Sequence, residues 1–214
     1  NENGVRGGNV DRTWYTIAHY NLNPGGWNGW CTLSDYYDKF ESIDERRGIY
    51  YNYPADTTSN RKKNYGRQNV GFFAGQQYNW TTNKPLMARN PANAPLVFTR
   101  EVTIRTSGAT LETAGIRPMK YAFDYAVDGQ RNNDWVVYRY SDVLLMQAEA
   151  ILRGGTGTAA EALTIVNSIR SKRGVAAFPS LTLENLLDER ARELYWEGWR
   201  RQDLIRFGKF DLPG

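Results

Sequence analysis

Apolar residues recur at helical spacing after residue 140 and predict a pair of helices with marked ends. The first is expected over residues 141–153, where Gly154 and the glycine after it end the apolar pattern. The second is expected to begin after Thr158, because the Thr158 hydroxyl can cap the helix while Glu161 reaches back in a T-x-x-E capping box. Its apolar stripe continues to Gly174, which stops it.

A third helix is expected from near Thr182 to about Phe207. One of its faces changes from aliphatic to charged along its length, through Leu183, Leu186, Leu187, Arg190, Leu194 and Glu197. The two preceding helices span 34 residues, 141–174, which is the length of one tetratricopeptide helix-turn-helix unit. A lone unit cannot bury both of its faces, so its partners are expected to be the third helix or residues outside this chain.

Residues 1–134 have a different texture, rich in glycine, asparagine, proline and aromatic residues and poor in long periodic runs. A short helix is expected within residues 32–44, with Ser34 as its N-cap. Residues 96–104 alternate and carry several β-branched side chains, which predicts a strand. Prolines divide the remainder into loops and turns. We therefore expect a loop-rich part over residues 1–134 and a helical part over residues 135–214.

Composition narrows the class of protein. The 214 residues are 41% hydrophobic, 23% charged and 14% aromatic, as in an ordinary globular protein. The single cysteine, Cys31, cannot close an internal disulfide, and with the lone His19 it cannot complete a zinc site, so we expect no metal and no cofactor. The net charge is +4 with bases and acids interleaved, which does not indicate a nucleic-acid partner. No apolar run approaches the roughly 18 residues of a membrane helix.

Known catalytic motifs are absent. The sequence GTGTAA at residues 155–160 fits a dinucleotide-binding loop formally, but it follows a helix, so we interpret it as a helix–helix turn. A glycoside hydrolase needs only two carboxylates, and Glu189, Glu193 and Glu197 share a predicted helix face. Arginines crowd these glutamates and should keep them ionised, whereas a general acid needs a raised pKa. We therefore expect a structural ion-pair network and no catalysis.

The segment GGWNGW at residues 25–30 is the strongest ligand-binding candidate. Its glycines allow a tight turn, and its two indoles present electron-rich faces that suit the C–H face of a sugar ring. The alternative for Trp27 is that it anchors its own loop in the core, whereas polar neighbours favour exposure of Trp30 and Trp80. The predicted glycan-binding residues are Trp27, Asn28, Trp30, Trp14, Tyr78, Trp80 and His19.

Three segments in this order resemble the SusD/RagB family of surface glycan-binding lipoproteins of Bacteroidetes. The first is the turn at residues 25–29 followed by TLSDYYDKF at 32–40 and DER at 44–46. The second, RYSDVLLMQAEA at 139–150, is similar to the family's R-Y-x-[DE]-V-x-L-x-x-A-E-A helix. The third, DERARELYWEGWRRQDLIRFG at 188–208, is similar to its E-R-x-x-E-L-x-x-E-G-x-R-x-x-D-L-x-R-x-G signature.

This resemblance implies a mostly α, SusD-like fold with tetratricopeptide-like helical packing, long aromatic loops and a few short β-strands. It identifies residues 1–214 as one C-terminal portion of such a protein, without the lipidated cysteine, the N-terminal helical repeats and the C-terminal tail. The implied function is non-catalytic capture of glycan at the extracellular face of the outer membrane, and delivery to a SusC-type TonB-dependent transporter. The implied membrane attachment is a lipid anchor not present in this chain. The alternative is a tetratricopeptide-like scaffold that binds protein without direct glycan contact.

Overall fold

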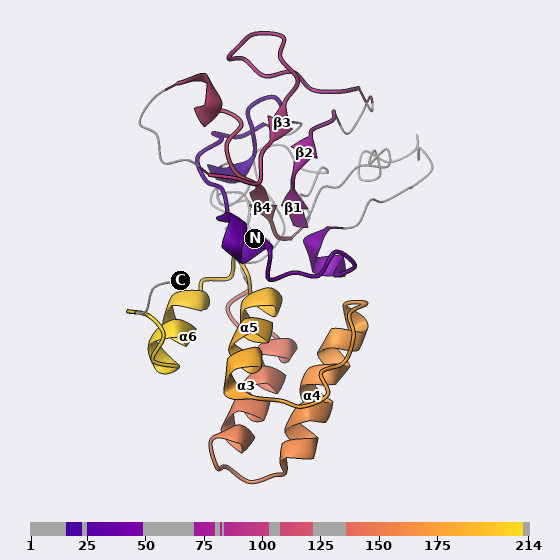
Figure 1. The fold of residues 1–214 in the computed structure, drawn as a ribbon, viewed down its shortest axis with the longest axis vertical. Coiled ribbons are helices and arrows are strands. Elements are labelled where there is room, and N and C mark those ends of the chain that lie inside the picture. The colour runs from indigo at the N-terminus through magenta and orange to yellow at the C-terminus, as the bar shows by residue number, and fades with distance from the viewer. Residues whose placement is uncertain are drawn as a thin grey trace, which may run out of the picture. The chain divides into compact units, whose positions relative to one another are not determined.

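Two compact units make up the computed structural model. One is built from Asn1–Asp38 and Gly48–Trp135, and the other from Lys39–Arg47 and Val136–Gly214. We call them the strand unit and the helical unit, because the first carries the short strands and the second the long helices (Figure 1). The structure describes residues 16–22, 25–48, 71–79, 82, 84–102, 108–121 and 136–211.

In the helical unit, α3 (Tyr140–Leu152) and α4 (Ala159–Lys172) lie side by side, which confirms both predicted helices to within a residue (Figure 1). The capping box is also confirmed. Thr158 Oγ1 accepts a hydrogen bond from the Glu161 N–H at 3.2 Å, and the Glu161 carboxylate accepts one from the Thr158 N–H at 2.6 Å. Gly174 follows α4 with φ +70°, a backbone conformation that favours glycine. The turn at residues 155–160 joins two helices, as expected.

The third predicted helix is broken in two: α5 (Leu183–Glu193) and α6 (Arg200–Arg206). The expectation of one continuous helix was wrong because Trp196 and Gly198 adopt positive φ of 63° and 83°. The contact between Arg190 Nε and Asp203 Oδ2 at 2.9 Å shows why the break matters. In one straight helix these two residues would be about 20 Å apart at 1.5 Å per residue.

The core of the helical unit lies between α3, α4 and α5. Its members recur at three- and four-residue spacing along α3 and α4, so one stripe of each of these helices faces inward, and Leu186 joins them from α5. Burying an aliphatic side chain of this kind contributes about 1.5–3 kcal/mol relative to leaving it exposed. The core residues are Leu145, Ala148, Ala162, Val166, Ile169 and Leu186.

The strand unit holds two small antiparallel sheets, one pairing β1 (Gly71–Phe73) with β4 (Arg117–Met119) and one pairing β2 (Gly75–Gln76) with β3 (Val97–Phe98). The strand predicted over residues 96–104 is therefore only two residues long. It ends because the Thr99 hydroxyl donates to the Glu101 carbonyl oxygen and closes a turn, and residues 103–107 lie outside the described residues. The strand unit also has the short 3₁₀ turn η3 (Ala109–Leu111), and its buried apolar side chains include Ile17, Phe72, Phe73, Leu96, Phe98, Ile116 and Met119.

The helix predicted within residues 32–44 is the single turn α2 (Ser34–Tyr37). Ser34 is its first residue and not its N-cap, a position that Leu33 occupies without a side-chain cap. Phe40 continues the apolar pattern but lies beyond α2. It is buried inside the helical unit, where its ring meets the Tyr195 ring edge-on at a centroid distance of 5.8 Å. Among the described residues no helix is long and apolar enough to cross a membrane.

Candidate functional site

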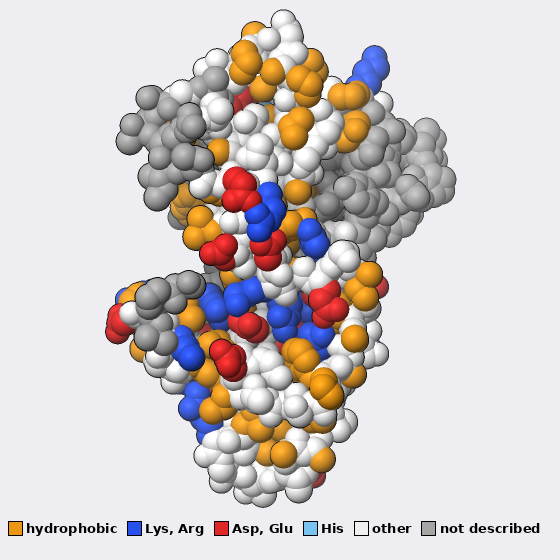
Figure 2. Space-filling view, in the orientation of Figure 1, with side chains coloured by type: hydrophobic (Ala, Val, Ile, Leu, Met, Phe, Trp, Pro, Cys, Tyr) orange, Lys and Arg blue, Asp and Glu red, His pale blue; other side chains and the backbone are white. Residues whose placement is uncertain are grey.

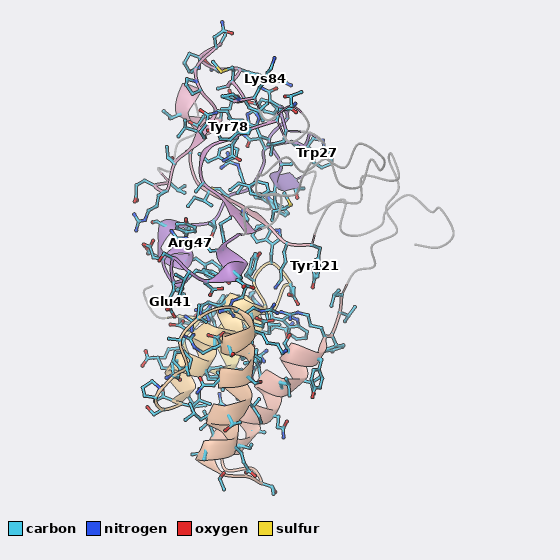
Figure 3. The ribbon with its side chains drawn as sticks, turned by 90° about the vertical axis from the view of Figure 1, so that its right-hand side faces the viewer. Trp27, Glu41, Arg47, Tyr78, Lys84 and Tyr121 are labelled. Carbon is cyan, nitrogen blue, oxygen red and sulfur yellow. The ribbon has the colours of Figure 1, made fainter. Side chains whose placement is uncertain are left out.

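Two tryptophans stand on a turn of the strand unit with much of their surface in water. The Trp27 side chain is 72% exposed and Trp30 is 56% exposed, so Trp27 is not the core anchor that the alternative required. An exposed indole forgoes the stabilisation of burial, and such rings are favoured at binding surfaces because they join an apolar face to a polar N–H. Figure 3 shows Trp27 in this unit.

Backbone hydrogen bonds hold this turn against residues 16–19. The N–H groups of Asn28 and Gly29 donate to the carbonyl oxygens of Ala18 and Thr16 at 2.9 and 2.6 Å. Gly29 packs so closely that an added Cβ would lie 3.0 Å from the Thr16 oxygen. A side chain at this position would crowd the Thr16 carbonyl group, which favours glycine here.

The Asn28 side chain supports the turn from within. Its Nδ2 donates to the Glu112 carbonyl oxygen at 2.9 Å, and its Oδ1 accepts from Arg117 Nε at 2.9 Å. Asn28 also has φ +54°, a conformation that asparagine tolerates better than most residues. We expected Asn28 to meet sugar hydroxyls at the rim, but its amide is already engaged by the protein, so we assign it a positioning role.

Arg117 is a buried cation beneath the turn, with 2% of its surface exposed. Besides Asn28, its guanidinium donates to the carbonyl oxygens of Glu112, Ala114 and Gly115. Burial lowers the pKa of this guanidinium to about 10. These neutral oxygens satisfy its N–H groups, so Arg117 fixes the loop that carries Glu112 without needing a carboxylate partner.

His19 lies in the interior with no exposed surface, so it cannot extend an aromatic surface as we expected. Its Nδ1 accepts from the Asn21 N–H at 3.0 Å, which leaves Nε2 as the donor to Glu112 Oε1 at 2.8 Å. Burial is the main reason that the pKa of His19 is lowered, and the neutral ring keeps both bonds. His19 is therefore a support for the turn, through the same Glu112 that holds Asn28.

Glu112 is the residue that joins these loops. Besides His19, its carboxylate accepts from the N–H groups of Arg89 and Asn90, each at 2.7 Å. Burial alone would raise the pKa of Glu112, but the hydrogen bonds from Arg89, His19 and Asn90 outweigh it and lower that pKa. The sequence analysis missed Glu112, Arg117 and Arg89, because nothing in their local pattern shows that three distant loops meet.

The other predicted aromatic residues do not join the turn. Tyr78 is half-buried on the hairpin where it forms a bridge with Pro85, and in Figure 3 it lies apart from Trp27. Trp14 and Trp80 lie outside the described residues. The candidate site of the strand unit is therefore the pair Trp27 and Trp30 on their supported turn.

The helical unit contains the ion-pair network expected from the sequence, and its visible face shows basic and acidic side chains side by side (Figure 2). Glu189 accepts from Arg46, Arg170 and Arg192 at 2.7–2.8 Å. Its carboxylate has no exposed surface, yet Arg46 and Arg192 overcome the effect of burial and lower its pKa. The carboxylate is thus held ionised, unlike that of a general acid.

Glu193 is bound in the same way. It accepts from Arg139 and Arg173 at 2.7 Å and from Arg46 at 3.2 Å. Burial opposes ionisation, but the hydrogen bonds from Arg173 and Arg139 lower the pKa of Glu193 to about 2. Glu197 lies beyond the end of α5 and pairs with Arg139 at 2.9 Å, so it joins the network without sharing the helix face. The partners from outside α5 come from distant parts of the sequence.

These lowered pKa values predict an acid-labile helical unit. A carboxylate with a depressed folded-state pKa stabilises the fold fully above its unfolded pKa, and this contribution is lost as the pH falls toward the folded value. For Glu193 that window runs from its ordinary value near 4.5 down to about 2. We expect the free energy of unfolding to fall as the pH is lowered through this window. Urea titrations at each pH, monitored by far-UV circular dichroism, measure this change. A flat profile between these pH values would contradict the assignment.

Among the described residues, no group of three or more histidine, cysteine, aspartate or glutamate side chains is placed to hold a metal ion. The described residues offer a hydrogen-bonded, exposed aromatic turn in one unit and an ionised, arginine-bound set of carboxylates in the other.

Comparisons with known proteins agree with this picture. The starch-binding protein SusD of Bacteroides thetaiotaomicron is 33% identical over 115 residues, covering 50% of this chain and 20% of that protein. The SusD-like protein P38 of Formosa agariphila is 36% identical over 87 residues, covering 35% of this chain and 17% of that protein. This chain thus spans about a fifth of the length of these curated relatives.

Solved structures confirm the predicted fold class. A SusD-like protein from Bacteroides fragilis superposes with a TM-score of 0.56 at 20% identity, over 96% of this chain and 42% of that one. The family model described as the SusD family matches residues 2–212, which is nearly the whole sequence. The short antiparallel strands, the helical unit, the three family segments in order and this match together show that the chain belongs to the SusD family.

Proposed function

We propose that this chain binds glycan without chemical change, by stacking sugar rings on Trp27 and Trp30. The observation that carries the proposal is their exposure, 72% and 56%, on a turn that backbone bonds hold in place. The C–H groups on one face of a pyranose carry slight positive charge and fit the electron-rich face of an indole. A turn already fixed in its bound shape pays less conformational entropy when a ligand binds.

The family supports this proposal. The relative from Bacteroides thetaiotaomicron is a starch-binding protein, and the same ligand class suits exposed indoles. We further propose that the whole protein acts at the extracellular face of the outer membrane, held there by a lipid anchor. In this proposal it delivers its glycan to a SusC-type TonB-dependent transporter. Capture of such a transporter by the tagged full-length protein from native membranes would support delivery, and its consistent absence would contradict it.

We propose binding without catalysis because the pKa values of the Glu189 and Glu193 carboxylates are lowered. A glycoside hydrolase needs one carboxyl group with a raised pKa to protonate the leaving oxygen. Glu189 and Glu193 have lowered pKa values and are enclosed by arginines. They suit a structural role, and release of reducing sugar by the purified protein would argue against the proposal.

Replacing Trp27 or Trp30 tests the site directly. In the full-length protein we expect Trp27→Ala and Trp30→Ala each to weaken binding of a ligand oligosaccharide about tenfold, or ~1.4 kcal/mol, because tryptophan dominates such contacts. Isothermal titration calorimetry against a panel of oligosaccharides provides the affinities. The matched control is Tyr140→Ala, which removes an aromatic side chain that is 75% exposed in the helical unit. Unchanged affinity in both tryptophan variants would reject the site.

A further inference from the structure

The sequence ranges that hold the tryptophan turn and Arg89 carry few charged residues. Residues 16–34 contain no aspartate, glutamate, lysine or arginine, and the only residues of these four types within 71–99 are Lys84 and Arg89. Neither range has an aspartate or a glutamate. Glu112 approaches this region from the next loop, but it is buried and its carboxylate is already bound by three donors. The charged side chains within these two ranges are therefore basic.

Arg89 is held in a fixed position next to the turn. Its guanidinium carbon lies 4.0 Å above the centre of the Tyr20 ring, a cation–π contact. Its Nε donates to Asn21 Oδ1 at 3.2 Å, and Asn21 is itself oriented by donating from Nδ2 to the Met87 carbonyl oxygen at 2.8 Å. An aromatic ring and a side-chain amide thus fix the plane of this guanidinium.

The same tyrosine connects Arg89 to the tryptophan turn. A Cβ placed on Gly25 would lie only 2.8 Å from the Tyr20 carbonyl oxygen, so the turn begins against the backbone of this residue. Arg89 stacks on the Tyr20 ring, and Trp27 follows Gly25 by two positions. Tyr20 therefore lies against the Arg89 guanidinium through its ring and against the start of the tryptophan turn through its backbone.

Arg89 differs from the arginines of the helical unit in its partners. Arg46, Arg139 and Arg173 each pair with a carboxylate there. In the part of the chain that the structure describes, no carboxylate lies within ion-pair distance of Arg89, and neither Nη1 nor Nη2 has an acceptor. A guanidinium that is exposed, oriented and left with four N–H donors matches the two oxygens of a carboxylate or a sulfate.

We propose that Arg89 binds an anionic substituent of the glycan, so that the chain selects an acidic polysaccharide over a neutral one. This inference rests on the proposed glycan site at Trp27 and Trp30. The indoles hold the sugar ring, and the Nη1 and Nη2 groups of Arg89 donate to the oxygens of a carboxylate or a sulfate. The shared chemistry is a flat anionic group with two or more acceptor oxygens.

Three tetrasaccharides of similar length test the inference in the full-length protein: tetragalacturonate with carboxylates, a sulfated carrageenan tetrasaccharide, and neutral maltotetraose. We expect at least one anionic tetrasaccharide to bind more tightly than maltotetraose, and its identity distinguishes carboxylate from sulfate. Added salt should weaken only the anionic complex, because exposed charge pairs are screened. Arg89→Gln should weaken that complex about five- to tenfold and leave maltotetraose unaffected.

Two further variants control this experiment. Arg89→Lys keeps the charge but loses the planar fork, so we expect an intermediate affinity. Arg100→Gln removes an arginine of the same unit that is half-exposed but already paired with Asp38 and Glu101, and it should leave all affinities unchanged. The backbone N–H of residue 89 still donates to Glu112 in the Arg89 variants, so the loop should keep its fold.

The outcomes separate this inference from the proposed function. If no anionic tetrasaccharide binds more tightly than maltotetraose, or if Arg89→Gln leaves the anionic complex unchanged, Arg89 does not select the ligand. If either result is found while Trp27→Ala still loses binding, the role of Arg89 is overturned and the glycan site at the tryptophans stands. If the wild-type protein binds none of the three tetrasaccharides, the inference fails together with the glycan site on which it rests.

Discussion

Replacing Glu193 by glutamine is expected to destabilise the helical unit by about 3–5 kcal/mol, which is a large share of the stability of a typical domain. The Glu193 carboxylate is 1% exposed and receives hydrogen bonds from Arg46, Arg139 and Arg173. Glutamine has nearly the same shape, but it presents one neutral oxygen and an amide group that points N–H donors at guanidinium donors. Arg173 would lose the carboxylate with which it pairs, whereas Arg46 and Arg139 would keep Glu189 and Glu197, so part of the positive charge in this buried site would be uncompensated.

Urea unfolding of the full-length protein, followed by far-UV circular dichroism, measures this loss. The matched control is Glu184→Gln, which replaces an exposed glutamate in the first turn of α5. This change should remove only the favourable interaction of the Glu184 charge with the helix dipole, about 0.3–1 kcal/mol. A loss for Glu193→Gln no larger than for Glu184→Gln would show that the network contributes little. The same variant should also flatten the dependence of stability on pH between about 4.5 and 2, because it removes the titrating group.

Replacing Glu112 by glutamine is the second large change, and it should destabilise the strand unit by about 2–4 kcal/mol. The carboxylate accepts from His19 Nε2 and from the N–H groups of Arg89 and Asn90. Glutamine has one acceptor oxygen, and its amide group would face at least one of these donors. A buried donor left without an acceptor costs about 1–3 kcal/mol, and bonds to a charged group contribute about 1.5–3 kcal/mol each.

This change should also weaken glycan binding, although Glu112 touches no ligand in our proposal. Its main chain accepts from Asn28, so loosening the loop that carries Glu112 loosens the tryptophan turn. Glu101→Gln is the control, because Glu101 is exposed in the same unit and its one ion pair among the described residues is with exposed Arg100. Thermal unfolding gives the stability and calorimetry with the strongest-binding oligosaccharide gives the affinity. Wild-type values for both would mean that Glu112 does not organise this turn.

The α3–α4 hairpin could be predicted almost fully because its signals are local. Helical spacing, the capping box of Thr158 and Glu161, and Gly174 each act within a few residues. The α5–α6 break could not be predicted, since the sequence from 194 to 199 contains no proline and reads as helix. Positive φ at Trp196 and Gly198 brings Asp203 back to Arg190, and this gain is visible only in three dimensions.

The candidate site shows the same division. The glycines and tryptophans of residues 25–30 predicted an aromatic turn from local sequence alone, and the turn is there with Trp27 and Trp30 exposed. His19 and Asn28 look like sugar contacts in the sequence because both carry polar groups near aromatic residues. Their side chains are instead engaged by Glu112 and Arg117, about ninety positions away in the chain.

The sequence by itself determined the helical hairpin, the aromatic turn, the arginine–glutamate signature and the family to which the chain belongs, because each depends on residues close together along the chain. Only the tertiary structure decided which polar groups support the fold and which remain at the surface. A buried charge or donor must find its partner wherever the chain folds back, as Glu193 does with Arg46 and Glu112 with His19. No local pattern records that partner, so the exposed, oriented guanidinium of Arg89 came to light only in the folded molecule.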